Sequence, residues 1–287
     1  MARLPKSSLV AQPGTRLESR RPEMKVEHVS CYVCGSSDSR LWARENGWAA
    51  VRCGGCGLVY VDPRPALETI SRATETGAHA GGVDRYRPKK VAFYRDRLAS
   101  LYEPGVFRAL RGRWLDIGCG YGEFLEALAA ASHGALELSG TEPNRVKAAS
   151  ARARGLDVRG LDEDRDGAPF CGISLLNVFG HLPDPPSLLG CLRAELAPDG
   201  ELLLQTGNWA ELERAEIPDR LNLPDHLSFA SEALVRRVLE TAGFSVVRVG
   251  RFDMFRPGLL EKAARALFAK HARPRACDLW FRARPAS

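Results

Sequence analysis

A glycine-rich turn between an apolar segment and an amphipathic segment constrains the fold of this chain most. Residues 113–128 read Arg-Trp-Leu-Asp-Ile-Gly-Cys-Gly-Tyr-Gly-Glu-Phe-Leu-Glu-Ala-Leu. The apolar run predicts a strand that ends near Asp116, and the residues after the turn show helical periodicity. Glycines at 118, 120 and 122 allow a sharp turn and let a ligand lie against the main chain. The pattern predicts a parallel α/β sheet with a ligand site at the carboxyl end of this strand.

Two acids indicate which ligand suits this turn. The glycine spacing, G-x-G-x-G, differs from the G-x-G-x-x-G of dinucleotide binders. Asp116, just before the turn, would repel a pyrophosphate and attract a cation or an amine. A second strand over residues 135–141 ends at Glu142, where a carboxylate can accept both ribose hydroxyls of an adenosine.

Later segments continue the alternation of strands and helices. We expect strands at residues 156–158, 173–179 and 201–205, and helices at residues 146–154 and 188–196. Alternation of this kind gives a parallel sheet with helices on both faces.

Four of the eight cysteines are grouped near the start of the chain. Cys31 and Cys34 form one C-x2-C pair, and Cys53 and Cys56 form another after eighteen intervening residues. This spacing is typical of a zinc site, and four thiolates leave no open position for water or substrate. With short strands expected around the pairs, residues 28–65 are predicted to be a four-cysteine zinc ribbon whose Zn²⁺ is structural.

Charge is concentrated at the amino terminus. The chain carries 41 Lys and Arg against 35 Asp and Glu, a net charge of +6, and residues 1–25 alone contribute +4. We therefore expect residues 1–27 to be a disordered basic tail, which makes nucleic acid an unlikely partner. Helical patterns at 67–73 and 89–102 predict a helical connector over residues 66–110 that covers the mouth of the active site. There is no apolar run of membrane-spanning or signal-peptide length, so the expected location is cytoplasmic.

Several motifs together resemble the class I S-adenosylmethionine-dependent methyltransferases. They are Leu-Asp-Ile-Gly-Cys-Gly-Tyr-Gly, Glu142, His181-Leu-Pro-Asp-Pro, Pro198-Asp-Gly and Asp225-His-Leu-Ser-Phe-Ala-Ser231. The resemblance implies a seven-stranded, doubly wound, Rossmann-like sheet over residues 111–287. Its sixth strand would lie at 244–249, and its antiparallel seventh, at 277–282, would insert between the fifth and the sixth. A helix at 259–270 would connect these two strands.

The resemblance also implies a cofactor, S-adenosyl-L-methionine, and its binding residues. The glycine turn and Asp116 would hold the methionine part, Glu142 the ribose and Asp162 the adenine, while Asn177 and Phe179 would line the methyl-donor pocket. The complete expected set is Asp116, Gly118, Cys119, Gly120, Tyr121, Gly122, Glu142, Pro143, Asp162, Asn177 and Phe179.

The cysteine module narrows the resemblance to bacterial methyltransferases of deoxysugars and surface glycans. Residues 53–64 fit their C-x2-C-G-L-x-Y/F-x-D-P-R pattern. The expected acceptor is a small molecule or glycan, methylated on a sugar hydroxyl of a nucleotide-linked sugar, a polysaccharide or a secondary metabolite. Sugar C-methylation is an alternative, although Leu223 stands where the tyrosine of a Tyr-x-x-His segment would be. A ribosomal RNA base methyltransferase is another alternative, based on Arg40, Arg44 and Arg52, and a catalytically silent protein that binds the cofactor is a third.

Hydroxyl methylation needs a group that takes the proton. His226, on a loop after the fifth strand, is the first candidate, with orientation of that loop as the equal alternative. His181 is a second candidate, more often a residue that packs beside the cofactor. Asp225 is expected to orient His226. Tyr86 and Tyr94 could reach the acceptor from the connector, although packing is the commoner role for such residues.

Overall fold

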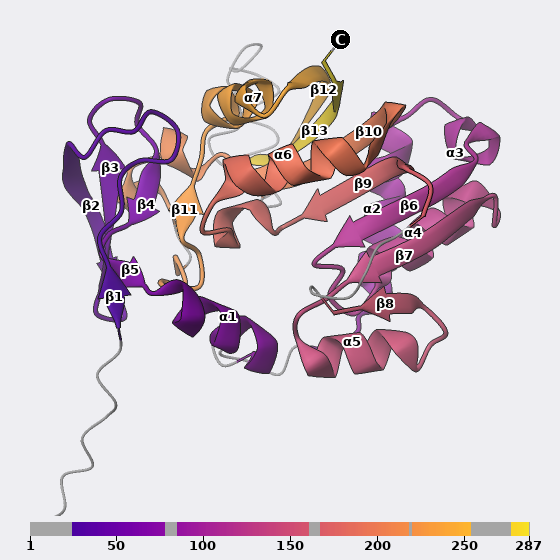
Figure 1. Cartoon of the computed structure of the whole chain (residues 1–287), viewed down its shortest axis with the longest axis horizontal. Helices are drawn as coiled ribbons and strands as arrows, with labels where there is room; N and C mark the ends of the chain where they lie inside the picture. Colours follow the sequence, from indigo (N-terminus) through magenta and orange to yellow (C-terminus); the bar gives the residue numbers. More distant parts are fainter. Residues whose placement is uncertain (1–24, 78–84, 161–166, 218–219, 254–276, 287) are drawn as a thin grey trace, which may run out of the picture.

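The computed structural model of the chain describes residues 25–77, 85–160, 167–217, 220–253 and 277–286 (Figure 1). Asp162, the helix expected at 259–270 and all but three residues of the expected tail lie outside these ranges.

A seven-stranded sheet forms the centre of the molecule, in the order β12-β13-β10-β9-β6-β7-β8. Its strands are β6 (Gly112–Ile117), β7 (Leu136–Thr141), β8 (Asp157–Arg159), β9 (Phe170–Leu176), β10 (Leu196–Gly207), β12 (Phe244–Asp253) and β13 (Cys277–Pro285). Strands β6 to β10 pair in parallel, whereas β13 runs antiparallel to both β10 and β12. The expected seven-stranded α/β sheet, with its last strand inserted between the fifth and the sixth, is confirmed.

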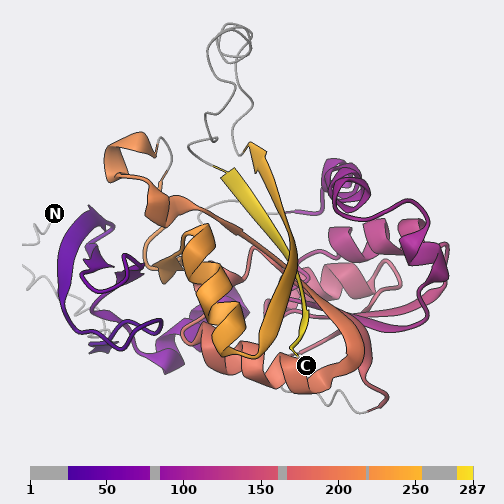
Figure 2. The same cartoon turned by 90° about the horizontal axis from the view of Figure 1, so that it is seen from above.

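Helices cover both faces of this sheet (Figure 2). The helices are α2 (Pro88–Leu101), α3 (Val106–Ala109), α4 (Glu123–Ser132), α5 (Arg145–Arg152), α6 (Pro185–Glu195) and α7 (Glu232–Thr241), and one more, α1 (Leu67–Thr76), contacts α5. Successive side chains of a strand point to opposite faces. Accordingly Leu203 packs with Leu98 of α2 and Phe124 of α4, whereas its neighbour Leu202 packs with Leu189 of α6 and Val235 of α7. The sheet is therefore buried on both sides.

Several strand boundaries differ from expectation, and two of the differences change the chain path. Strand β10 begins at Leu196 rather than residue 201, because the residues around Pro198-Asp-Gly continue the pairing through a register shift. Strand β9 ends at Leu176 rather than residue 179. Asn177 takes a left-handed φ of +57°, and the chain turns into the short 3-10 helix η1 (Phe179–His181). Two more 3-10 turns, η2 (Trp209–Glu211) and η3 (Arg214–Glu216), follow β10.

The cysteine module forms a second, antiparallel sheet at one end of the molecule (Figure 1). Its strands are β2 (Ser39–Glu45), β3 (Trp48–Cys53), β4 (Val59–Val61) and, from far along the chain, β11 (Ser228–Phe229). A two-stranded ladder, β1 (Val26–Glu27) with β5 (Arg64–Pro65), flanks it, so a strand begins before the expected end of the tail.

The cysteine module and the large sheet share one hydrophobic core. Leu58 and Val59 of the module are fully buried in the same cluster as Leu223 and Phe229. The module is therefore joined to the rest of the molecule by packing as well as by strand pairing, and we call residues 28–65 the ribbon.

Candidate functional site

The glycine turn lies at the carboxyl ends of β6 and β7, where it forms one wall of a cleft. Gly118 has a φ of +67°, and a Cβ there would lie 2.6 Å from Cγ2 of Val178. Gly120 has a φ of +57° with open space where its Cβ would point. Both positions favour glycine, and the second leaves the main chain accessible to a ligand.

Glu142, directly after β7, connects this turn to the neighbouring loop. Its side chain is buried, and Oε2 accepts a hydrogen bond of 2.7 Å from the Gly120 amide while Oε1 accepts one of 2.8 Å from the Asn144 amide. Glu142 also lines the cleft, and carboxylate oxygens are acceptors for the hydroxyl donors of a ligand.

Asp116 lies beneath the turn rather than in the lining of the cleft. It is 2% exposed and accepts a hydrogen bond of 2.5 Å from Oγ of Ser174. Burial, together with the nearby Glu142 and Glu123 carboxylates, raises the pKa of Asp116 to about 7. Three acids thus surround the floor of the cleft and favour a cationic ligand.

Most of the residues expected to bind the cofactor meet in this cleft, whose volume is about 650 Å³. Those that line it are Gly118, Cys119, Gly120, Tyr121, Glu142, Pro143 and Asn177, and the two candidate bases, His181 and His226, line it as well. Gly122 instead precedes α4, with a φ of +84° and Leu156 packed against it. Phe179 is 1% exposed in the hydrophobic core, so its expected place in the pocket is wrong. The early end of β9 turns its side chain away.

Several lining residues were missed, two of them because they come from distant elements. Glu123, Asn144, Gln205 and Trp280 all line the cleft. Trp280 reaches the cleft because β13 inserts beside β10, and no local sequence pattern near residue 280 indicates this insertion. Glu123 could have been found, since it directly follows the glycine turn.

The two connector tyrosines have different environments. Tyr94 lines the cleft and packs its ring edge-on against Phe124 at 5.5 Å and Trp280 at 6.3 Å between centroids. Burial raises the pKa of Tyr94, which therefore stays protonated. Tyr86 donates a hydrogen bond of 2.6 Å to Oε2 of Glu126 on α4.

A second cavity of about 710 Å³ adjoins the cleft. The two share Phe93, Asn177, His181, Gln205, Asn222 and His226. Beyond these, the second cavity is lined by aromatic and charged side chains that include Arg97, Trp209, Arg220, Phe229, Asp253 and Asp278. Two ligands, one bound in each cavity, would therefore lie next to each other beside the two histidines.

The two histidine rings are stacked, with centroids 4.3 Å apart and planes at 28°. Nδ1 of His226 lies 2.8 Å from the Leu221 carbonyl, an arrangement that places a proton on Nδ1 and leaves Nε2 able to accept one. Burial, and then the charge of His181, lower the pKa of His226 to about 4. His226 is therefore neutral near pH 7.

Asp225, which was expected to orient His226, instead contacts His181. Nδ1 of His181 lies 2.9 Å from the Asp225 carbonyl and 3.3 Å from Oδ1 of Asp225. Burial opposes its charged form, but Asp225 outweighs burial and raises the pKa of His181. The expectation that Asp225 orients His226 is wrong, because the Leu221 carbonyl does so.

The four ribbon cysteines converge on one point. Their Sγ atoms all lie within 4.8 Å of one another, with Cys31–Cys56 and Cys34–Cys53 both at 3.5 Å. A tetrahedral zinc with bonds of about 2.3 Å requires sulfurs about 3.8 Å apart. The donor set and its geometry therefore fit a closed metal site.

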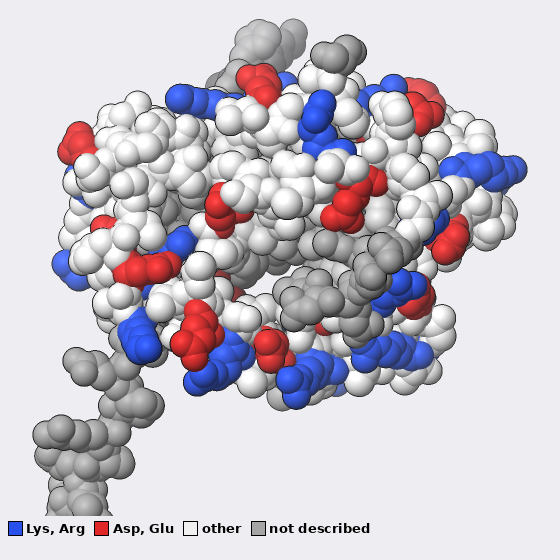
Figure 3. Space-filling view, viewed as in Figure 1, with Lys and Arg blue, Asp and Glu red and all other residues white. Residues whose placement is uncertain are grey.

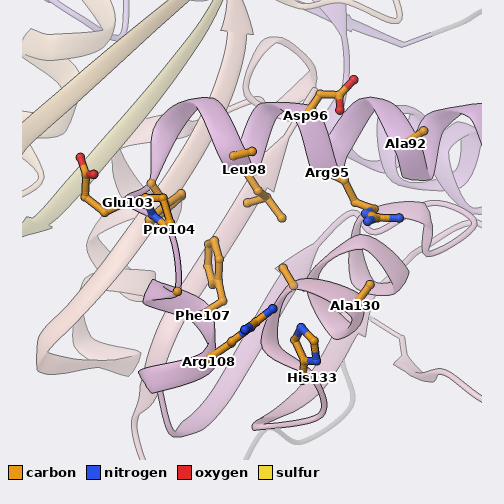
Figure 4. Close-up of a pocket in the computed structure, with 14 residues that line it drawn as sticks. Ala92, Arg95, Asp96, Leu98, Glu103, Pro104, Phe107, Arg108, Ala130 and His133 are labelled. Carbon is orange, nitrogen blue, oxygen red and sulfur yellow. The ribbon is translucent and has the colours of Figure 1, made fainter.

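A further hollow of about 730 Å³ lies between α2, α3 and α4 (Figure 4). Phe107, Arg108 and His133 line it. These residues come just before β6 and β7, so the hollow lies at the amino ends of the strands, away from the glycine turn. Ligands of such sheets bind at the opposite, carboxyl edge.

Comparison with known families identifies the family to which the chain belongs. The family described as "Methyltransferase domain" matches residues 83–249, which span the connector helix, the glycine turn, Glu142 and both histidines. The chain belongs to this methyltransferase family. It is an S-adenosylmethionine-dependent methyltransferase of class I, an enzyme whose acceptor is a small molecule or a macromolecule. No curated protein matches the methyltransferase.

Solved structures agree on the fold. The methyltransferase resembles the [4+2]-cyclase SpnF, with 18% identity, a TM-score of 0.50, and coverage of 78% of this chain and 99% of that one. It also resembles a chain of the complex between the Haloferax volcanii Trm112 methyltransferase activator and a candidate methyltransferase, with 15% identity, a TM-score of 0.51, and coverage of 76% and 98%. A third likeness is to a candidate sarcosine dimethylglycine methyltransferase from Galdieria sulphuraria, with 14% identity, a TM-score of 0.50, and coverage of 69% and 86%.

The surface and the helices add two observations. Lys and Arg alternate with Asp and Glu over the face in Figure 3, and no continuous basic patch is visible on that face. In the part of the chain that the structure describes, no helix is long and apolar enough to cross a membrane.

Proposed function

We propose that this methyltransferase transfers a methyl group from S-adenosylmethionine to a hydroxyl of a sugar acceptor, such as a nucleotide-linked sugar, a glycan or a glycosylated secondary metabolite. The observation that carries the proposal is the junction of the two cavities at His226. The cleft with the glycine turn takes the cofactor, and the second cavity takes the acceptor. A bound acceptor hydroxyl would then lie beside a neutral imidazole.

The cofactor site is proposed from the acids and the turn. Residues 118–122 and the charge of Asp116 hold the methionine part, Glu142 beside Pro143 binds the ribose hydroxyls, and Asn177 lines the methyl-donor pocket. Asp162 is proposed for the adenine. Both the ammonium and the sulfonium of the cofactor are cations, which the buried carboxylates of Asp116, Glu123 and Glu142 favour.

His226 is the proposed general base, and His181 supports its ring. In the transfer, the acceptor oxygen forms a bond to the methyl carbon while the carbon–sulfur bond breaks, with its electron pair remaining on sulfur. The hydroxyl proton passes to Nε2 of His226. The sulfonium charge is lost as the imidazolium charge appears, so the acids around the site stabilise a cation throughout. Alignment of the two substrates supplies the rest of the rate enhancement.

The acceptor class is proposed from the second cavity. Trp209 and Phe229 offer rings on which a sugar can stack, and Asn222 offers an amide for its hydroxyls. The Arg97 guanidinium lies over the rings of Phe93 at 4.5 Å and Phe252 at 3.9 Å, and its buried Nε has no partner among the described residues. A phosphate or carboxylate on the acceptor would pair with this guanidinium, which lines the cavity.

The alternatives have less support. Arg52, one of three arginines that suggested an RNA substrate, is used internally, since it donates to the carbonyls of Ala210 at 2.8 Å and Leu212 at 2.9 Å. Leu223, at the position of the tyrosine in sugar C-methyltransferases, is 2% exposed in the shared core and offers no phenol to the cavity.

A structural zinc ion in the ribbon completes the proposal. The four converging thiolates of Cys31, Cys34, Cys53 and Cys56 support it. A metal with four protein ligands holds the two turns together and has no position for substrate.

An acceptor screen tests the function. The enzyme is incubated with methyl-labelled S-adenosylmethionine and nucleoside diphosphate sugars, free glycans or ribosomal RNA, and the methyl position is assigned by mass spectrometry and NMR. We expect an O-methyl sugar, and we expect His226→Gln to lower kcat by about 10²- to 10⁴-fold with unchanged affinity for S-adenosylhomocysteine. The exposed His28→Gln serves as the control. A methyl on carbon or on an RNA base, or cofactor binding without turnover on any acceptor, would refute the proposal.

A further inference from the structure

The hairpin of the ribbon ends against the loop that carries His226. Glu45 is the last residue of β2, and its carboxylate accepts hydrogen bonds from three consecutive amides. Oε2 accepts from Leu221 at 2.9 Å, and Oε1 accepts from Asn222 at 2.7 Å and, more weakly, from Leu223 at 3.4 Å. The next residue, Asn46, donates from Nδ2 to the Leu223 carbonyl at 2.8 Å.

The residues whose amides bind Glu45 use their carbonyls to hold His226. The Leu221 carbonyl accepts from Nδ1 of His226 at 2.8 Å, and the Asn222 carbonyl accepts from the His226 amide at 3.2 Å. Asn222 has a left-handed φ of +57°, which turns the chain sharply at this point. One carboxylate of the ribbon therefore fixes both peptide units that set the position and tautomer of the ring.

The chain after His226 enters the ribbon sheet. The Val61 amide of β4 donates to the Leu227 carbonyl at 2.9 Å, and Oη of Tyr32 lies 3.1 Å from Oγ of Ser228. Phe229 of β11 contacts the His226 ring, with centroids 5.6 Å apart. The ribbon thus holds the His226 loop on both sides of the histidine.

We infer that Glu45 is a positioning residue, through which the ribbon orders residues 221–226 so that Nε2 of His226 faces the junction of the two cavities. The ribbon is then part of the active-site construction as well as a folding module. This inference rests on the proposed function only in the role given to His226 as the base.

Glu45 influences the pKa of His226 in two ways, through its charge and through the order of the loop, and the sign of the change separates them. The charged or titratable groups that act on His226 are His181, Asp225 and Glu45. Removal of the Glu45 charge by itself takes away a negative neighbour and lowers the pKa of His226 further below its ordinary value of 6.5. Loss of the ordered loop lets the ring reach water and raises that pKa. The two effects have opposite signs.

The test uses the full-length, zinc-loaded protein with ¹⁵N-labelled histidine. NMR reports the tautomer and the pKa of His226 in the native protein and in Glu45→Gln, which keeps Oε1 but places an NH₂ group against the Leu221 amide. We expect one tautomer, protonated at Nδ1, in the native protein. In Glu45→Gln we expect a mixture of tautomers and a pKa raised by one unit or more, with zinc content and S-adenosylhomocysteine affinity unchanged within twofold. Glu27→Gln, at an acid of β1 that binds Arg64 of the ribbon, is the matched control and should change neither the tautomer nor the pKa of His226.

A single unchanged tautomer in Glu45→Gln, with the pKa equal to or below the native value, would overturn the inference. If that variant does not retain zinc, Glu45→Asp replaces it, since it keeps the charge but is one methylene shorter and withdraws the carboxylate from the three amides. Mixed tautomers support the inference, and one tautomer overturns it. A tautomer change in Glu45→Gln, combined with full methyl transfer by His226→Gln, would leave the positioning role intact and refute only the proposed base.

Discussion

Substitution of Glu142 by Gln tests the proposed ribose site most directly. Gln has nearly the same shape, but it carries no charge and has one acceptor oxygen instead of two. In the native protein the two oxygens accept from the amides of Gly120 and Asn144. In the variant one of these amides must face an NH₂ group, so the turn and the ribose site are both perturbed.

The size of the effect follows from the bonds that change. Hydrogen bonds to charged groups contribute about 1.5–3 kcal/mol each, roughly twice the value of neutral ones. Loss of the charge from a single ribose contact, together with the repulsion at one amide, should weaken the binding free energy by about 1.5–3 kcal/mol. This is about a 10- to 100-fold rise in the Kd for S-adenosylhomocysteine.

Isothermal titration calorimetry with S-adenosylhomocysteine measures this change. Glu137→Gln is the matched control, because Glu137 lies on the same strand, β7, near its amino end, and its side chain is exposed beside Arg113. The control should bind as the native protein does. If folded Glu142→Gln also binds with native affinity, the carboxylate makes no contact with the ligand and the assignment of the ribose site is wrong.

Two further predictions concern the zinc ion and pH. Removal of the metal by a chelator, or Cys34→Ser, should lower Tm by roughly 10 °C or more, because a structural zinc contributes several kcal/mol and the ribbon shares a core with the rest of the protein. Calorimetry with metal analysis measures this change. An unchanged Tm after complete metal loss would contradict the prediction. Since the folded-state pKa of His226 is depressed to about 4, the unfolded chain binds more protons between about pH 4 and 6.5. The stability that His226 contributes is therefore complete above pH 6.5 and is lost as pH falls through 4. His226→Gln should reduce this loss by on the order of 2 kcal/mol in urea titrations at pH 7 and pH 4, and an identical pH dependence in native protein and variant would show that the ring is not desolvated.

Local patterns were sufficient to predict most of the large sheet and its cleft. The apolar run through Ile117, the glycine spacing after it and the acid at Glu142 lie within thirty residues of one another, and each has a direct conformational consequence. The cysteine spacing likewise predicted four thiolates that converge on one point. In these cases the residues that meet in space carry their own signal.

The predictions that failed depend on backbone turns and distant contacts. Phe179 looked like part of an apolar strand, but the left-handed Asn177 turned the chain and sent the ring into the core. Asp225 precedes His226 directly, and yet it faces His181, because the loop is held from outside by Glu45. A two-residue strand such as β11 has too little periodicity to be seen in sequence.

That short strand has a consequence for the order in which the protein is made. The ribbon cysteines leave the ribosome early, but the edge strand that pairs with β4 comes from Ser228 and Phe229, about four-fifths of the way along the chain. Until those residues are synthesised, β4 has a free edge, and free strand edges invite pairing with other chains. During translation the sheet of the metal-bearing hairpins therefore stays incomplete until most of the methyltransferase has been synthesised. A gene fusion that joins residues 28–65 to another protein would carry that open edge with it.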